Sequence, residues 1–350
     1  MSDRPLLKLG EYRDADLKVI HPRATLEIES PECRGELSRP ASVRTIDVPE
    51  HYLVELRDVT CAPRQLLIQQ DVLLPDCFRR RSARYAHVQL EPAGEGAFRP
   101  KVAIAAQARI DVPCFYLDGE HTDHFGHLTL EVLSRLWPFK AIDLSSYYFV
   151  TFAAPTRRIV ELLEPFGVAA NRLLFLNQPV LIRHLTVASQ SYVLEQSVSS
   201  AAFAVWNRIG DYYGTAHGAP SRIYVSRAHW RQQRSLVDEP VIEAAARRLG
   251  YDVVYPEEMS IPAQVGLFRG AEAIAGPGGS GLYNCVYSRK TGSRTILAPA
   301  KFVSPNDALV NAQTRSHVTH LTGKTVADRV SPMLGDWSID PQLVVDTLGR

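Results

Sequence analysis

The sequence predicts an α/β protein with two domains of alternating strands and helices and an extra β-rich N-terminal region. Apolar runs typical of buried strands alternate with helical segments between residues 147 and 182, and again between 222 and 298. Strands that alternate with helices form parallel sheets, so each stretch indicates one βα domain. A stretch containing several glycines and a proline, residues 207–221, separates the two alternations.

The expected domain boundaries follow from these patterns. Residues 1–206 contain the β-rich N-terminal region and the first βα domain, residues 207–221 form a linker, and residues 222–350 form the second βα domain. Two such domains are expected to face a cleft, with ligands at the carboxyl ends of the parallel strands. The sequence does not indicate the oligomeric state.

Local patterns define the individual elements. In the N-terminal region, strands are expected at residues 66–74 and 101–105. In the first βα domain, strands are expected at 147–152, 173–176 and 180–182, and helices at 128–137 and 156–165. Thr156 is the expected N-cap of the second of these helices, and Gly167 follows its end. In the second domain, strands are expected at 222–226, 251–255, 273–275 and 294–298, and helices at 240–249 and 261–268.

The composition argues against several classes of protein. The 350 residues include 39 basic and 38 acidic side chains, whereas a dedicated nucleic-acid binder usually carries a clear basic excess. No apolar run is long enough to span a bilayer, and the N-terminus has no signal-peptide pattern. The five cysteines form no CxxC pair. We therefore expect no nucleic-acid partner, no integral membrane segment, and a cytoplasmic location, with peripheral association at the inner face of the membrane as an alternative.

A loop with four glycines in six residues, Gly276 to Gly281, follows the predicted strand at 273–275. A strand, a glycine loop and a helix beginning near Leu282 are an arrangement that brings backbone N–H groups up to a phosphate. A plain βα turn is the alternative interpretation. The candidate diphosphate contacts of this segment are Gly278, Gly279, Ser280, Gly281 and Asn284.

Three arginines, Arg227, Arg231 and Arg234, closely follow the predicted strand at 222–226. Guanidinium groups suit phosphate oxygens because they are always charged and bind in a bidentate fashion. A solvated basic loop is the alternative. Since the glycine loop lies two strand units downstream, both clusters are expected to converge on one diphosphate.

His127, Glu131 and Arg135 are spaced i, i+4, i+8 and form one polar stripe on the predicted helix. A histidine beside a carboxylate is a workable general base, because the carboxylate orients the ring and raises its basicity. Three alternatives remain open: a metal site formed with His121 and His124, a buried structural network, and a surface salt-bridge ladder.

Several common motifs are missing from the sequence. The one Asp-x-Asp spacing, Asp14 to Asp16, lies in a polar N-terminal stretch rather than after an apolar strand. No P-loop pattern occurs, and the glycine loop departs from Gly-x-Gly-x-x-Gly and lies late in its domain. These patterns argue against a P-loop kinase and against an NAD enzyme. We expect no cofactor, and any nucleotide would be a substrate.

Taken together, these segments resemble glycosyltransferase family 61. The resemblance rests on residues 123–137, on residues 222–239 and, most specifically, on residues 255–284. In order and spacing it covers about residues 120 to 300, and the first 115 residues carry none of it.

The resemblance implies a GT-B-like fold and a hexosyl- or pentosyltransferase that works with inversion and without an obligatory metal. It implies a nucleotide-diphospho sugar donor on the C-terminal domain, a glycan acceptor, and a role in bacterial capsule or other surface polysaccharide synthesis. His127, or else Glu131 or Asp123, would deprotonate the acceptor hydroxyl. Arg227, Arg231 and Arg234, with the amides of Gly279 to Gly281, would stabilise the departing diphosphate.

This sequence departs from many family members at three positions. Gly278 stands where many have His, Ser280 where many have Ala, and His124 where many have Asn. If that family histidine contacts donor phosphate, its role here is lost or passes to Ser280 or an arginine. The changed glycine loop motivates one alternative, a non-catalytic nucleotide-sugar-binding or assembly module of a polysaccharide system. A separate alternative is a GT-B-like enzyme that acts on a nucleotide sugar without an acceptor, such as an epimerase.

Overall fold

The computed structural model describes residues 4–5, 16–79, 87–94, 97–230, 234–327 and 335–349. The chain forms two compact units. The first unit comprises Met1–Thr25 and Asp47–Val205, and the second comprises Leu26–Ile46 and Trp206–Arg350. The helix α3, Ser200–Tyr213, includes residues 207–213 of the predicted linker, so the boundary between the units falls inside a helix.

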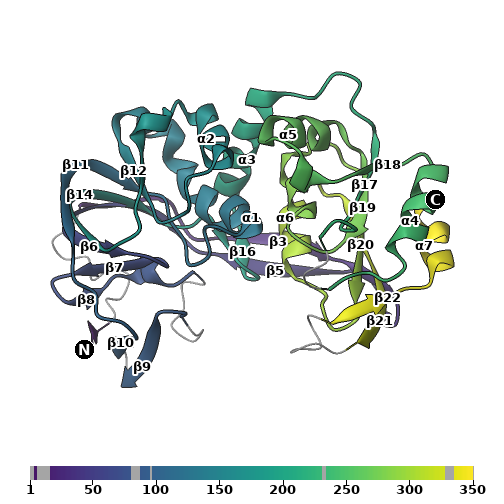
Figure 1. Cartoon of the computed structure of the whole chain (residues 1–350), viewed down its shortest axis with the longest axis horizontal. Coiled ribbons are helices and arrows are strands. Elements are labelled where there is room, and N and C mark those ends of the chain that lie inside the picture. The colour runs from purple at the N-terminus through teal and green to yellow at the C-terminus, as the bar shows by residue number, and fades with distance from the viewer. Residues whose placement is uncertain are drawn as a thin grey trace. The chain divides into compact units, whose positions relative to one another are not determined.

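The first unit is built on a mixed sheet with the strand order β13-β12-β11-β14-β6-β7-β8 (Figure 1). Its four parallel strands are β11 Ala108–Tyr116, β12 Tyr148–Thr151, β13 Leu173–Phe175 and β14 Val180–Ala188. Four strands extend it in antiparallel fashion: β2 Asp16–His21, β6 His51–Ala62, β7 Leu66–Gln69 and β8 Val72–Leu73. The predicted strands at 147–152, 173–176 and 180–182 are thus confirmed.

The predicted β-rich character of the N-terminal region is confirmed. Some of its strands join the large sheet of the first unit, β4 joins that of the second unit, and the others form small sheets. The predicted strand at 66–74 is a hairpin, because Gln70 and Asp71 adopt φ of +47° and +65° and make a tight turn. The predicted strand at 101–105 is wrong. These residues pair with no strand in the described part of the chain, and of the five only Ile104 is partly buried against the core.

Smaller strands complete this part of the chain. β1 Arg4–Pro5, β10 Ala97–Pro100 and β9 Leu90–Gly94 form a three-stranded sheet. β3 Ala24–Ser30 pairs with β5 Ser42–Val48, and β15 Tyr192–Val193 pairs with β16 Ser197–Val198. Short helices η1 Pro75–Cys77, η4 Leu144–Ser146 and η6 Ala170–Arg172 connect strands of the first unit.

A continuous helical segment follows β11, and its winding changes twice. It begins as α1 Phe125–His127, widens into a π-helical turn, η2 Leu128–Val132, and tightens into a 3₁₀ helix, η3 Leu133–Lys140. The predicted helix at 128–137 is therefore present but continues past Pro138. The second predicted helix is confirmed as α2 Arg157–Leu163 and η5 Glu164–Phe166, with Thr156 at its N-cap and left-handed Gly167 at its end.

The main path of the sheet in the second unit runs β18-β17-β19-β20-β21, all parallel, followed by the antiparallel β22 (Figure 1). Their bounds are β17 Arg222–Val225, β18 Asp252–Val254, β19 Ala273–Pro277, β20 Ser293–Pro299, β21 His317–Ala327 and β22 Asp336–Ser338. Numbered along the chain, the parallel order is 2-1-3-4-5. Strand order reverses between β17 and β19, which is the position where such sheets bind ligands.

Helices alternate with these strands as predicted. They are α4 Glu239–Arg248, η7 Pro256–Glu258, α5 Ile261–Gly270, η8 Leu282–Tyr287, α6 Asn306–Asn311 and α7 Pro341–Leu348. Figure 1 shows α4 and α7 side by side, where Ile242 and Ala246 share a core with Val344 and Leu348. β4 Glu32–Gly35 adds to this sheet beside β21, so part of the N-terminal region belongs to the second unit.

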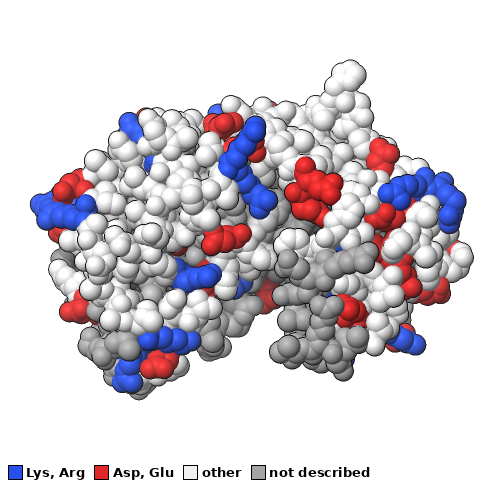
Figure 2. All heavy atoms as spheres, in the orientation of Figure 1, with Lys and Arg blue, Asp and Glu red and all other residues white. Residues whose placement is uncertain are grey.

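Charged side chains are interspersed on the face drawn in Figure 2, where blue and red groups alternate across the described residues instead of forming one large field. Within the described part of the chain, no helix combines the length and apolar character needed to cross a membrane.

Close approach of β17 and β19 depends on a glycine. Gly276 has φ of +151°, and a Cβ at this position would lie 2.2 Å from the carbonyl oxygen of Val225. No other residue type fits this position without moving a strand.

We therefore expect Gly276→Ala to lower the free energy of unfolding by roughly 1–3 kcal/mol through backbone strain, with the steric overlap in addition. Denaturant unfolding of the full chain measures the change. Gly278→Ala is the matched control, because a Cβ there meets its nearest neighbour, Ile296 Cγ2, at 3.5 Å. Equal stability of the two variants would contradict this account of the strand pairing.

Candidate active site

The glycine loop lies at the reversal point of the second sheet. It follows β19, and Arg227 follows the neighbouring strand β17. The guanidinium Nη1 of Arg227 donates a hydrogen bond to the carbonyl oxygen of Gly278 at 2.8 Å. A Cβ at Gly279 would lie 2.5 Å from the same Nη1 atom, so the arginine fills the space over the loop. The predicted convergence of Arg227 and the glycine loop is present.

A buried carboxylate fixes the backbone that carries Arg227. Glu239 Oε1, at the start of α4, accepts hydrogen bonds from the backbone N–H of Arg227 at 2.7 Å and from Ser226 Oγ at 3.2 Å. Burial raises the pKa of Glu239, whereas these hydrogen bonds lower it, and the balance is a raised value. Burial also lowers the pKa of Arg227. The position of this guanidinium is thus set by the fold.

Arg234 approaches the same region with unused hydrogen-bonding capacity. Its guanidinium carbon lies 3.9 Å from the ring centre of Phe302, and its Nε and Nη1 atoms are buried without a hydrogen-bond partner among the described residues. Burial and the charge of Arg227 lower the pKa of Arg234 to about 10. Its backbone is left-handed, with φ of +53°, a strained state for this residue type. Strain and unpaired donors are both features of ligand sites.

The other predicted donor contacts differ in exposure. Gly278, Gly279, Ser280 and Gly281 are half-buried and stand at the surface of the loop. Asn284 is fully buried and donates from Nδ2 to Gln264 Oε1 at 2.9 Å, which ties η8 to α5. Arg231 lies outside the described residues. The helix after the loop, η8, is a 3₁₀ helix of 6 residues.

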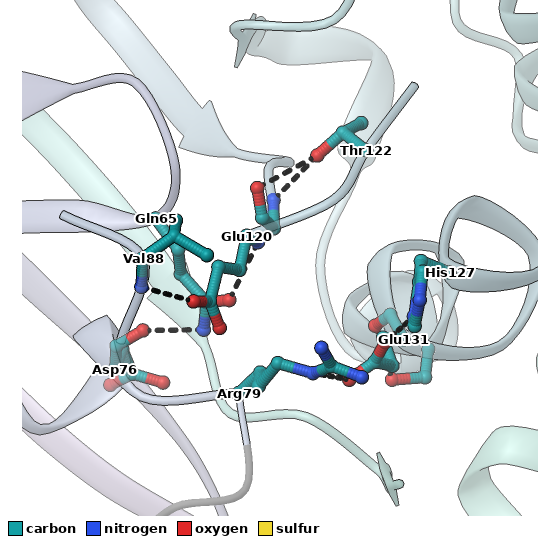
Figure 3. Close-up of polar contacts among 10 residues, drawn as sticks. Gln65, Asp76, Arg79, Val88, Glu120, Thr122, His127 and Glu131 are labelled. Atoms are coloured by element: carbon teal, nitrogen blue, oxygen red, sulfur yellow. Dashed lines mark hydrogen bonds and ion pairs between the residues drawn. The ribbon is translucent and has the colours of Figure 1, made fainter. Parts of the chain in front are cut away.

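The predicted catalytic pair forms in the first unit. His127 Nδ1 contacts Glu131 Oε2 in a short hydrogen bond, and Arg79 Nε donates to Glu131 Oε1 at 3.2 Å (Figure 3). Burial raises the pKa of Glu131, whereas the hydrogen bond from His127 and the charge of Arg79 lower it. The lowering effects are the larger, so the pKa of Glu131 lies below its ordinary value. Glu131 is 4% exposed, so the alternative of a surface salt-bridge ladder is wrong.

Arg135 does not join this pair. It is fully buried and donates from Nη1 to Asp76 Oδ1 at 3.2 Å and to the carbonyl oxygen of Ala188 at 2.7 Å. The π-helical turn at Leu128–Val132 explains the difference, because a wider turn rotates later residues off the expected face. Arg79, far away in sequence, takes the predicted place of Arg135 beside Glu131.

Two more histidines stand beside His127. The ring centres of His121 and His124 lie 5.1 Å and 5.0 Å from that of His127. Burial, with the charges of His127 and Arg79, lowers the pKa of His121. Within the described residues, no group of three or more His, Cys, Asp or Glu side chains is arranged to hold a metal ion. Asp123 is exposed, and its Oδ1 accepts a hydrogen bond from the backbone N–H of Ala154 at 2.7 Å.

Sequence reasoning missed three charged residues near these sites. Arg79 is distant from Glu131 along the chain, and no local pattern connects them. Glu239 lies within the segment that carries the resemblance, but its contact with the backbone of Arg227 is not a periodic feature. Asp118 directly follows the strand β11, just as Arg227 follows β17, so the strand-end criterion that found the arginine would also have found it.

Each unit presents groups of a kind found in enzymes that move a group from a phosphate ester. The second unit offers guanidinium groups and a glycine loop at a strand reversal, and the first offers a histidine oriented by a buried carboxylate. The sequence match agrees with this class. Residues 125–296 match the family model Glycosyltransferase 61, which confirms the resemblance over this segment. A comparison with curated proteins gives no match.

The lowered pKa of Glu131 predicts a pH-dependent contribution to stability. A carboxyl group whose folded pKa lies below its unfolded value stabilises the fold above the unfolded value, here 4.5, and loses that contribution as the pH falls through the folded value. The difference in unfolding free energy between the wild type and Glu131→Gln should therefore be largest above pH 4.5 and shrink below it. Urea unfolding across this range measures the difference. Glu55→Gln, exposed on β6, is the control. A difference independent of pH would contradict the assigned charge of Glu131.

Proposed function

We propose that this glycosyltransferase is an inverting enzyme that moves a hexosyl or pentosyl group from a nucleotide-diphospho sugar to a glycan acceptor. The observation that carries the proposal is the pair of arginines at the β17–β19 reversal: Arg227 is fixed over the glycine loop, and Arg234 has buried, unpaired N–H groups. Two fixed cations at a strand reversal suit a diphosphate, and fixed charge stabilises a leaving diphosphate most as its bond breaks.

The first unit would supply the base. Because Nδ1 of His127 faces Glu131, the neutral ring carries its proton on Nδ1 and keeps the Nε2 lone pair free to accept another. The acceptor hydroxyl would lose its proton to Nε2 while its oxygen forms the bond to the anomeric carbon. The bond from that carbon to the phosphate oxygen breaks, and its electron pair leaves with the nucleoside diphosphate. Attack on the face opposite the leaving group gives inversion.

Arg227 would take over the role of the histidine that many family members carry at the position of Gly278. Many members of the family carry His at this position, where this chain has a glycine whose carbonyl oxygen accepts from Arg227. The position of Arg227 over the loop supports the transfer of a phosphate-binding role from the family histidine to an arginine. It also favours an active enzyme over the non-catalytic alternative.

The wider setting is proposed by analogy with the family. We place the activity in the synthesis of a bacterial capsule or other surface polysaccharide, in the cytoplasm or at the inner face of the membrane. The GT-B-like arrangement of two facing domains and the absence of a metal or other cofactor remain predictions.

Removal of either arginine should weaken catalysis. We expect Arg227→Ala and Arg234→Ala each to lower kcat/KM for the donor by at least about tenfold, equivalent to ~1.4 kcal/mol of transition-state stabilisation. Steady-state measurement of nucleoside diphosphate release tests this. Arg289→Ala, at an exposed ion pair with Asp211 in the same unit, is the matched control. Unchanged kinetics in both variants would remove the arginines from the donor site.

Transfer should also proceed without a divalent metal, since Arg227 and Arg234 provide the positive charge that a metal would supply. Activity is expected to be the same with and without EDTA, and NMR of the first product should show an anomeric configuration opposite to that of the donor. Loss of activity in EDTA that returns with added metal would contradict the proposal. Saturable nucleotide binding with no turnover would instead support the non-catalytic alternative.

A further inference from the structure

A pocket lies in the first unit, at the carboxyl ends of three neighbouring parallel strands. It has a volume of about 590 Å³ and is lined by residues that follow β11, β12 and β13, with the turn between β6 and β7 closing one side. Ligands of parallel sheets bind at this edge, and the volume falls within the range of small-molecule sites. No residue of this pocket takes part in the proposed donor site.

The lining combines carboxyl groups with aromatic rings. Asp118 and Asp123 contribute carboxyl groups, Phe152 and Phe175 contribute rings, and Asn177 contributes an amide. Carboxylates and amides accept hydrogen bonds from hydroxyl groups, and the apolar C–H face of a sugar ring packs on an aromatic ring. This mixture fits a polyhydroxylated ligand.

Asp118 has unused hydrogen-bonding capacity inside this lining. It is 1% exposed, and its Oδ1 accepts from Thr122 Oγ1 at 2.8 Å and from the backbone N–H of Phe152 at 3.1 Å. Its Oδ2 is buried and has no hydrogen-bond partner among the described residues. An unsatisfied buried oxygen is costly, and a hydroxyl or ammonium donor from a ligand would satisfy it. Burial also raises the pKa of Asp118 to about 6.

The charge of the lining limits which ligands fit. Three carboxyl residues, Asp118, Glu120 and Asp123, stand against a single guanidinium, that of Arg64. The side chain of Glu120 points toward Val88, and its Oε1 accepts a hydrogen bond from the backbone N–H of Val88 at 2.7 Å (Figure 3). Arg64 donates from Nη1 to the carbonyl oxygen of Glu120 at 3.1 Å. An anionic ligand would meet an excess of like charge, whereas a neutral or cationic one would not.

The pocket and the candidate base share one segment of the chain. Five lining residues, Asp118, Gly119, Glu120, Thr122 and Asp123, come just before α1, which carries His127. His121 belongs to the same segment, and its ring centre lies 5.1 Å from that of His127. One segment therefore carries both the pocket lining and the histidine that is proposed to take a proton.

We propose that this pocket binds the acceptor sugar and selects one that is neutral or carries an amine over one that carries a carboxylate or phosphate. Asp118 and Asp123 accept hydrogen bonds from its hydroxyl or amino groups, and Phe175 packs against its ring. The inference rests on the proposed function, since it assigns the acceptor half of the same reaction. The anionic donor binds to the basic loop of the second unit.

Saturation-transfer NMR titrations of the full chain test this with methyl glucoside, galactoside and mannoside, with the matching 2-amino sugars, and with the matching uronates. We expect neutral and amino glycosides to bind at least about tenfold more tightly than uronates, a difference comparable to one hydrogen bond to a charged group. Asp118→Asn and Phe175→Ala should each weaken binding. Asp123→Lys, at the exposed rim, should shift the preference toward uronates. Asp111→Lys, exposed on β11, is the matched control and should change nothing.

Stabilisation of each variant by nucleoside diphosphates is measured in parallel, because it reports the donor site alone. The inference is overturned if uronates bind as tightly as neutral glycosides, if the pocket variants keep wild-type affinity, or if no glycoside binds to the wild type. In each of these cases, intact nucleotide binding would still support the proposed donor site. Loss of nucleotide binding in the wild type, with glycoside selectivity retained, would count against the proposed donor and not against the pocket.

Discussion

The parallel pairing of β17 with β19 is the constraint on which the candidate donor site depends. Gly276 permits the approach, since any side chain there would overlap the carbonyl oxygen of Val225. The pairing sets the two strand ends next to each other, so that Arg227 reaches the carbonyl oxygen of Gly278. Glu239 then fixes the backbone of Arg227 from α4. The guanidinium is thus placed before any ligand arrives, and preorganised charge of this kind needs little rearrangement during reaction.

The first unit shows how similar burial gives two carboxyl groups opposite electrostatic behaviour. Glu131 and Asp118 are 4% and 1% exposed. His127 and Arg79 outweigh the effect of burial on the pKa of Glu131, so this group stays charged and orients the histidine. The partners of Asp118 are a hydroxyl and backbone amides, and burial raises its pKa to about 6. The cationic partners of Glu131 account for the opposite pKa shifts, so that one carboxyl group can orient a base while the other can meet a ligand.

The sequence predicted those features that depend on local periodicity. Strands such as β12 and β17 are short apolar runs, and the order of strands and helices follows from their alternation. Features that depend on contacts between distant residues were not predictable. The residues of β4, Glu-Cys-Arg-Gly, have no apolar alternation and become a strand because β21 offers an open edge. Arg79 pairs with Glu131 across the fold, and the π-helical turn that moves Arg135 away has no signature in the residue pattern. Of the candidate site, the strand-end arginine, the glycine loop and the His127–Glu131 pair were visible in the sequence, whereas the residues that hold them in place were not.

The proposed function requires that the β17–β19 reversal binds a nucleoside diphosphate. Thermal unfolding of the full chain with UDP, GDP, CDP, dTDP and CMP tests it most directly, because a ligand at about 100 times its Kd stabilises the fold by roughly 2.7 kcal/mol. One or more diphosphates should raise the Tm and CMP should do so less, and the effect should disappear in Arg227→Ala but persist in Arg289→Ala. No shift with any diphosphate, or an undiminished shift in Arg227→Ala, would contradict it.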